Sequence, residues 1–225
     1  MTSSSKAAMQ RLTAGDGHEF DCWMQPASTA RRAGLVILQE IFGVTDQLKR
    51  VAEKYAAQGL DVAVPALFDR KQRGAVIPFD DGPRGRELML SLDQEETMAD
   101  VAAAVAALTE SNEKVVVIGF CWGGGLALRC AQELDVAGAV SFYGTRLATL
   151  LEKSLRAPML FHFGTRDDHS PAEVIEQVRA AFPEAEIHLY DAGHAFANDA
   201  RSSYVGDAAK TAHARTEAFL DRILA

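Results

Sequence analysis

Short apolar runs alternate with longer amphipathic segments along most of this chain. The runs are rich in Val, Ile and Leu and predict buried strands at residues 35–43, 61–68, 114–120, 136–144, 157–164 and 185–193. Segments with helical periodicity lie between them, at residues 45–59, 93–112, 123–134, 170–182 and 206–224. Strands that alternate with helices in this way predict an α/β fold, with a mostly parallel sheet covered by helices on both faces.

Residues at the ends of the helical segments agree with this reading. Thr45 is a typical N-cap, and Gly59 is a typical stop at the end of the same segment. Ser170 is predicted as a second N-cap, with Pro171 at the first helical position and Glu173 closing a capping box.

Two stretches fall outside the alternation. Residues 9–26 read as two strands around a Gly-Asp-Gly turn, which predicts a leading hairpin. Residues 69–91 are mixed in character and long for a connection, which favours a functional segment such as a lid. We find no repeat or low-complexity linker, so a single domain over residues 1–225 is the simplest organisation.

Composition narrows the functional classes. The chain is 48% hydrophobic and 24% charged, which is typical of a soluble globular protein. Its net charge of -8 argues against a nucleic-acid partner, because such binding depends on basic patches. No apolar run approaches the roughly 20 residues of a membrane span, and the first residues lack the apolar core of a signal peptide. The three cysteines suit a reducing compartment, so we expect a cytoplasmic protein.

The most informative motif is the glycine-rich bend after the strand at residues 114–120. It does not fit a dinucleotide-binding fingerprint, because Cys121 stands where the second glycine belongs, and it lacks the Gly-Lys-Ser/Thr of a phosphate-binding loop. Gly119-Phe120-Cys121-Trp122-Gly123 instead matches the nucleophile elbow G-x-S-x-G, with cysteine in place of serine. Such an elbow presents its nucleophile at the edge of the sheet, where the following helix favours a thiolate and an oxyanion. Cys22 and Cys130 are interpreted as buried core residues.

A nucleophile of this kind needs a base and an acid from the ends of later strands. His194 follows the strand at residues 185–193 in a loop, whereas His18, His162, His188 and His213 lie within predicted hairpin, strand or helix positions and His169 precedes a helix. We therefore predict His194 as the base. Asp167 and Asp168 both follow the strand at residues 157–164, and spacing does not choose between them.

With these residues in this order, the chain resembles the dienelactone hydrolase family. The resemblance rests on "QEIFG", "GFCWGGG" and "DAGHAF" and extends over nearly the whole chain. It implies an α/β-hydrolase fold without a large cap domain and a Cys-His-Asp triad. The family pattern places the acid four residues before a proline, which selects Asp167, with Pro171 following.

The resemblance also implies roles around the nucleophile. Glu40 would lie near the cysteine and shift on substrate binding so that the thiol becomes a thiolate. Backbone N–H groups of Ile41 and Trp122 would form the oxyanion hole. Neither role needs a metal or an organic cofactor.

Substrate recognition is where the chain departs from the family pattern. The family grips a substrate carboxylate with two arginines, of which one matches Arg70, while Asn198 stands in the place of the other. Arg201 is close by in the sequence, and Tyr143 follows Phe142 in an altered aromatic wall.

The resulting hypothesis is hydrolysis of an ester or lactone of a small molecule through an acyl-enzyme. Two alternatives remain open: a general carboxylesterase or thioesterase for small neutral acyl groups, which Asn198 favours somewhat, and a non-catalytic protein with a reactive thiol. We expect no nucleic-acid or membrane partner, and a monomer or a small homo-oligomer.

Overall fold

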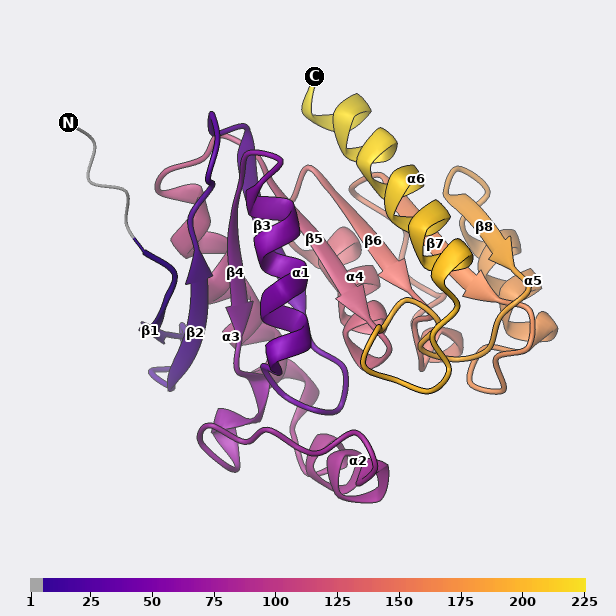
Figure 1. Cartoon of the computed structure of the whole chain (residues 1–225), viewed down its shortest axis with the longest axis horizontal. Helices are drawn as coiled ribbons and strands as arrows, with labels where there is room; N and C mark the ends of the chain where they lie inside the picture. Colours follow the sequence, from indigo (N-terminus) through magenta and orange to yellow (C-terminus); the bar gives the residue numbers. More distant parts are fainter. Residues whose placement is uncertain (1–5) are drawn as a thin grey trace. The chain divides into compact units, whose positions relative to one another are not determined.

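The computed structural model describes residues 6–225, and the chain divides into two compact units at Val116–Val117. Helices and strands alternate along both units, and each unit contains parallel strand pairs (Figure 1). The prediction of an α/β fold with mostly parallel strands is therefore confirmed.

The first unit begins with an antiparallel pair and continues with a parallel one. Its elements are β1 (Ala8–Thr13), β2 (Glu19–Gln25), β3 (Ala33–Leu38), α1 (Asp46–Ala56), β4 (Leu60–Pro65), η1 (Leu67–Arg70), α2 (Gly82–Leu90) and α3 (Gln94–Thr109). The strands lie in the order β1-β2-β4-β3. In the parallel pair, Leu35 of β3 lies opposite Val62 of β4. Helix α1 packs on β2 and β4 in front of the strands in Figure 1, and α3 packs on β3 and β4 behind them.

The second unit continues from β5 (Val115–Phe120), whose first two residues belong to the first unit. Its further elements are α4 (Trp122–Glu133), β6 (Gly138–Phe142), η2 (Leu147–Thr149), β7 (Met159–Gly164), α5 (Ala172–Ala181), β8 (Glu186–Tyr190) and α6 (Gly206–Leu224). The strands lie in chain order, and β6, β7 and β8 are parallel, with Phe142 opposite His162 and His162 opposite His188. Helix α4 lies behind these strands in Figure 1 and α6 in front, as predicted for a sheet covered on both faces.

Burial explains why the strands read as continuous apolar runs. Every residue of β3, β4, β5, β6 and β7 is buried. A strand covered on both faces loses the alternation of polar and apolar residues that a half-exposed strand shows. The last strand, β8, is only partly covered, and its Leu189 is exposed.

The helix signals were read correctly at one helix and wrongly at another. Thr45 caps α1 by accepting a hydrogen bond from the Leu48 N–H at 3.2 Å. Ser170, by contrast, is not the N-cap of α5: the cap position is Pro171, and no side chain caps the helix. The Ser170 hydroxyl donates instead to the carbonyl of Gly144 at 2.6 Å. The hydroxyl that the local pattern assigned to the helix end is therefore used in a tertiary hydrogen bond.

The stretch at residues 69–91 contains helix α2, which the sequence pattern did not predict. Asp81 caps α2 by accepting from the Arg84 N–H, and Pro83 stands near its start. These are ordinary start signals, but Gly85 is the only buried residue of the helix. The segment therefore lacks the apolar stripe by which a helix is predicted from sequence.

Candidate active site

Cys121 lies at the bend between β5 and α4 in a strained backbone conformation. Its φ is 55° and its ψ is -115°, which side chains with a Cβ rarely adopt and which costs on the order of 1–3 kcal/mol. The surrounding backbone holds it there. The Cys121 N–H donates to the carbonyl of Phe142, and the N–H groups of Gly124 and Thr145 donate to the Cys121 carbonyl, each at 3.0 Å.

Glycines make the bend possible because backbone approaches backbone on both sides of it. A Cβ on Gly119 would overlap the carbonyl of Gly123, and one on Gly124 would lie 2.6 Å from the Cα of Gly144. Neither clash could be relieved by turning a side chain. The glycines of the motif therefore serve the sharp turn of the chain and the close approach of α4 to the end of β6.

His194 and Asp167 form a closely hydrogen-bonded pair in the same unit. The distance from His194 Nδ1 to Asp167 Oδ2 is 2.8 Å, and the Asp167 side chain is 1% exposed. The other oxygen of Asp167 accepts from the backbone N–H of His169 at 2.8 Å. Asp168 is exposed. Of the two neighbouring acids that sequence spacing left equal, only Asp167 meets the imidazole.

The pKa of His194 reflects its contacts. Burial lowers this pKa, but hydrogen bonds and charge interactions with Asp167 and Cys121 outweigh burial and raise the pKa to about 10. A protonated His194 is favoured most strongly when Cys121 is a thiolate, because the two charges then attract. Cys121 and Asp167 thus both interact with His194 within the second unit.

Aromatic rings enclose the imidazole. The ring of Tyr143 lies 5.3 Å from that of His194 and 5.4 Å from that of Phe196, edge to face in both cases. The ring of His169 lies 4.4 Å from that of His194. Tyr143 was predicted to line the site, and the position of His169 before a helix allowed it to line the site without being the base.

Backbone strain concentrates around these residues. Among residues 6–225, the non-glycine residues with positive φ are Cys121, Tyr143, Arg146 and Ala195. They follow the ends of β5, β6 and β8, at the carboxyl edge of the parallel strands. Strain of this kind is found where the structure fixes groups for binding or catalysis.

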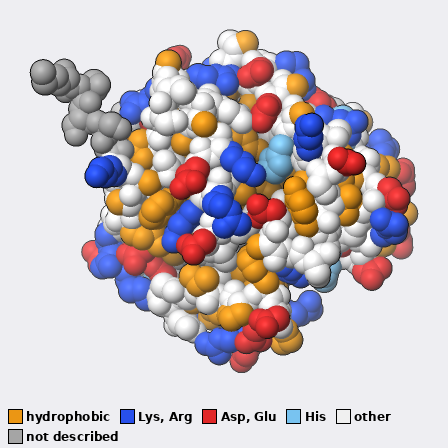
Figure 2. Space-filling model, in the orientation of Figure 1, with side chains coloured by type: hydrophobic (Ala, Val, Ile, Leu, Met, Phe, Trp, Pro, Cys, Tyr) orange, Lys and Arg blue, Asp and Glu red, His pale blue; other side chains and the backbone are white. Residues whose placement is uncertain are grey.

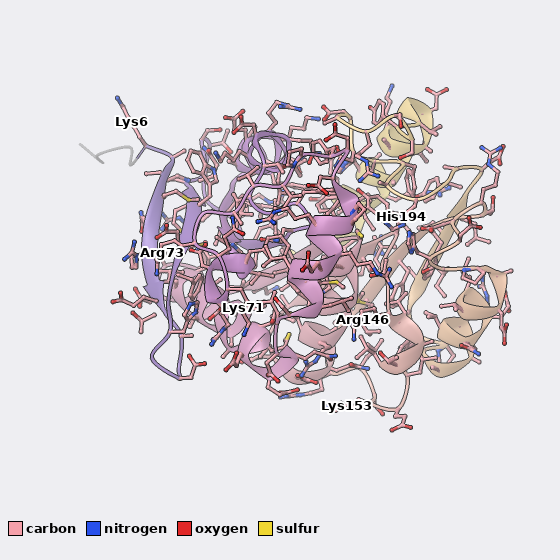
Figure 3. The ribbon with its side chains drawn as sticks, turned by 90° about the horizontal axis from the view of Figure 1, so that it is seen from below. Lys6, Lys71, Arg73, Arg146, Lys153 and His194 are labelled. Atoms are coloured by element: carbon pink, nitrogen blue, oxygen red, sulfur yellow. The ribbon has the colours of Figure 1, made fainter. Side chains whose placement is uncertain are left out.

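Figure 3 shows the structure from the side toward which the arrowheads of β5 and β6 point in Figure 1, and His194 and Arg146 are labelled on that side. On the face shown in Figure 2, basic and acidic side chains are interspersed.

The other two cysteines have a different environment. Cys22 in β2 and Cys130 in α4 are both fully buried, and all three cysteines are free. Burial raises the pKa of both the Cys22 and the Cys130 thiol far above the ordinary value. Neither is therefore a nucleophile at neutral pH, as expected for core residues.

Glu40 and Ile41 belong to the first unit, directly after β3. Glu40 is 6% exposed, and Ile41 is half-buried. The side chain of the preceding residue, Gln39, donates to the Glu40 carbonyl at 3.2 Å and accepts from the Leu67 N–H at 3.1 Å. The sequence pattern gave Gln39 no role, although a glutamine in an apolar run is a sign of such internal bonding.

Arg70 lies within a network of carboxylates in the first unit. Its guanidinium binds both oxygens of Asp100, at 2.9 and 2.7 Å, and one oxygen of Asp16 at 2.8 Å. The Arg70 side chain is only 7% exposed. These contacts occupy the donors that would otherwise bind a substrate carboxylate.

Asn198, which replaces a family arginine, belongs to a turn. It is 2% exposed, and its Oδ1 accepts from the Ala200 N–H at 3.0 Å. The Asn198 carbonyl accepts from the N–H of Arg201, whose side chain is half-buried. The asparagine side chain therefore shapes the loop that follows His194.

Two features are absent from residues 6–225. No helix in this range is both long and apolar enough to cross a membrane. In the same range, no three residues among the His, Cys, Asp and Glu side chains are grouped as metal ligands.

Sequence comparisons identify the family. A sequence model of the dienelactone hydrolase family matches residues 21–224. The carboxymethylenebutenolidase of Pseudomonas putida is 34% identical over 217 residues, which cover 91% of this chain and 92% of that protein. The carboxymethylenebutenolidase of Pseudomonas sp. strain P51 is 33% identical over 223 residues and covers 94% of each chain.

Solved structures agree at the level of the fold. A dienelactone hydrolase-like promiscuous phosphotriesterase from metagenomic libraries superposes with a TM-score of 0.77 at 18% identity, covering 97% of this chain and 99% of that one. The Pyrococcus furiosus esterase Pf2001 superposes with a TM-score of 0.74 at 15% identity, covering 99% and 94%. The chain therefore belongs to the dienelactone hydrolase family and has its α/β-hydrolase fold, and it is a hydrolase that acts on ester or lactone bonds.

Proposed function

We propose that the chain hydrolyses esters or lactones of small molecules through a covalent acyl-enzyme, with Cys121 as nucleophile, His194 as acid and base, and Asp167 as the residue that orients His194. The observation that carries the proposal is the strained Cys121 in contact with an imidazole that Asp167 holds at 2.8 Å. A strained nucleophile, a base and an orienting acid are the parts that acyl transfer requires.

The first step uses the charged pair. The Cys121 thiolate attacks the carbonyl carbon, a C–S bond forms, and the carbonyl electrons move to oxygen. When this intermediate collapses, the C–O bond breaks and the leaving oxygen takes the proton from His194. The products of this step are a thioester on Cys121, the alcohol and a neutral His194.

The second step needs a neutral imidazole, and the chemistry of the first step provides it. The thioester carries no charge, so the interaction with Cys121 that raises the pKa of His194 is lost. His194 then takes a proton from water as the water attacks the thioester. Collapse of this second intermediate releases the acid and restores the thiolate beside a protonated His194.

Backbone N–H groups of Trp122 and Ile41 are the donors that we propose for the developing oxyanion. Trp122 is the first residue of α4, so its N–H belongs to the helix terminus that favours negative charge. The roles of Ile41 and Glu40 rest on the family resemblance. Glu40 is buried, and a buried carboxylate influences the protonation of groups close to it.

The contacts of two predicted recognition residues favour a broader substrate range than a carboxylate-bearing lactone. Arg70 is paired with Asp100 and Asp16, and Asn198 bonds within its own turn. A small neutral acyl ester or thioester is therefore a second candidate substrate. The sparse, free cysteines support a cytoplasmic location for either activity.

The test compares Cys121→Ala with Cys22→Ala, which removes a buried cysteine outside the proposed triad. Turnover of p-nitrophenyl acetate and of cis-dienelactone should be lost in the first variant and kept in the second. A ratio of the two wild-type rates that favours the acetate would identify the broader esterase. Full turnover by folded Cys121→Ala would contradict the triad, and thiol labelling without turnover in the wild type would indicate a non-catalytic protein.

A further inference from the structure

The peptide group between Glu40 and Ile41 is held by the side chain of Gln39. Gln39 is fully buried, and both ends of its amide are used: Nε2 donates to the Glu40 carbonyl and Oε1 accepts from the Leu67 N–H. Leu67 begins η1, directly after β4. The Glu40 carbonyl is therefore tied to a neighbouring strand end through a side chain without freedom to move.

Fixing this carbonyl also fixes the Ile41 N–H. The peptide group is planar and trans, so its N–H points opposite to its C=O. A rotation of the Glu40–Ile41 peptide would break the bond to Gln39 and leave a buried amide without an acceptor. Gln39 thus sets the direction of the Ile41 N–H without touching it.

Gly85 restricts the next peptide along the chain. Gly85 is the buried residue of α2, and a Cβ there would overlap the carbonyl oxygen of Ile41. The same segment is bound to the loop nearby, because the Ile77 N–H donates to the Phe42 carbonyl at 2.9 Å. The rings of Phe42 and Phe79 also pack edge to face at 4.9 Å. The segment around α2 therefore fixes the loop that begins at Glu40.

We propose that Gln39 and Gly85 are positioning residues that fix the two peptide groups on either side of Ile41, so that the Ile41 N–H can donate to the oxyanion. This inference rests on the proposed function, in which that N–H is an oxyanion donor. It also gives the segment at residues 69–91 a role: α2 supports the oxyanion hole through Gly85, whether or not the segment moves as a lid.

The first test is Gly85→Ala against Gly82→Ala, two substitutions in the same helix. Gly82 has open space around it, with nothing within 4 Å of an added Cβ. Loss of a whole oxyanion donor typically costs about 10²–10³ in kcat, so we expect a displaced donor in Gly85→Ala to lower kcat about 10-fold or more. KM should change little, and Gly82→Ala should match the wild type.

The readout that separates positioning from general damage is alkylation of Cys121 by iodoacetamide. Alkylation requires the thiolate but forms no oxyanion, so its rate should be unchanged in Gly85→Ala while kcat falls. Gln39→Met is the second variant, because methionine has a similar length and adds no charge beside Glu40. Its kcat should also fall while its alkylation rate stays unchanged. If Gly85→Ala does not fold, Gln39→Met alone tests the inference.

Wild-type kcat in a folded Gly85→Ala or Gln39→Met variant would overturn the inference, as would alkylation that falls in step with kcat. Either result leaves the proposed function standing if Cys121→Ala is inactive. Turnover by Cys121→Ala would instead overturn the proposed function itself.

Discussion

Two histidine–aspartate pairs within residues 6–225, one in each unit, have almost the same geometry. His194 Nδ1 lies 2.8 Å from Asp167 Oδ2, and His18 Nδ1 lies 3.0 Å from Asp100 Oδ1. Both histidine side chains are 20% exposed, and both carboxylates are almost completely buried. Distance and burial alone would assign the two pairs the same role.

The groups beyond each pair make the difference. Asp100 also binds the guanidinium of Arg70 through both oxygens, and the ring of His18 stacks on Phe20 at 6.0 Å. The pair in the second unit has a strained cysteine beyond its imidazole instead. A histidine–aspartate pair is therefore a structural unit by default, and the contact of His194 with Cys121 supports the catalytic role that we propose for the pair in the second unit.

Among the effects we expect, the largest is a difference in kcat between variants of the two histidines. His194→Asn should lower kcat for p-nitrophenyl acetate by about 10³-fold or more, because it removes the acid and base of both steps. His18→Asn should leave kcat unchanged, since its partner Asp100 stays bound to Arg70. Steady-state kinetics measure kcat for both variants. A similar loss of activity in the two would contradict different roles for the two histidines.

The pair in the first unit should matter for stability instead of activity, and this can be tested by comparing the two aspartates that bind Arg70. Asp100→Asn leaves the buried Arg70 guanidinium without its bidentate partner, which we expect to lower the free energy of unfolding by about 3 kcal/mol. Asp16→Asn is the matched control, because Asp16 binds the same arginine but is 40% exposed, and its loss should lower the free energy of unfolding much less than the loss of Asp100. Urea denaturation measures both. Equal losses would mean that burial of the Asp100 pair does not matter.

The elbow was predictable from sequence because it is local. Gly119, Cys121 and Gly123 lie within five residues, and the steric need for glycine follows from the turn itself. The order of nucleophile, acid and base then pointed to His194. The alternation of apolar runs and helices was equally local, and the α/β fold that it predicted is confirmed.

Partners distant in the sequence could not be predicted. Arg70 binds Asp16 and Asp100, and no local pattern links these positions. Ser170 looked like a helix cap, but its hydroxyl bonds to Gly144. The choice of Asp167 over Asp168 required the family resemblance, because only tertiary structure buries one of two adjacent acids. The roles of the predicted site residues remain predictions.

The smallest expected effect is a change in titration. The pKa of His194 should be about 10 in the wild type and should fall in Cys121→Ala, because the thiol no longer supports the charged imidazole. Since the pKa is raised above its ordinary value of 6.5, the pair stabilises the fold fully below pH 6.5 and loses this effect as the pH rises through about 10. Histidine NMR signals measure the pKa. An unchanged value in Cys121→Ala would mean that the thiol does not interact with the imidazole.

If Cys121 is the nucleophile, it must carry the acyl group during turnover. The most direct measurement is peptide mass spectrometry of enzyme quenched during hydrolysis of p-nitrophenyl acetate, compared with enzyme quenched after the substrate is consumed. We predict an acetyl group on Cys121 during turnover that disappears afterwards, and none on Cys22 or Cys130. Turnover at the wild-type rate without any acyl group on Cys121, or with the acyl group on another residue, would contradict the account.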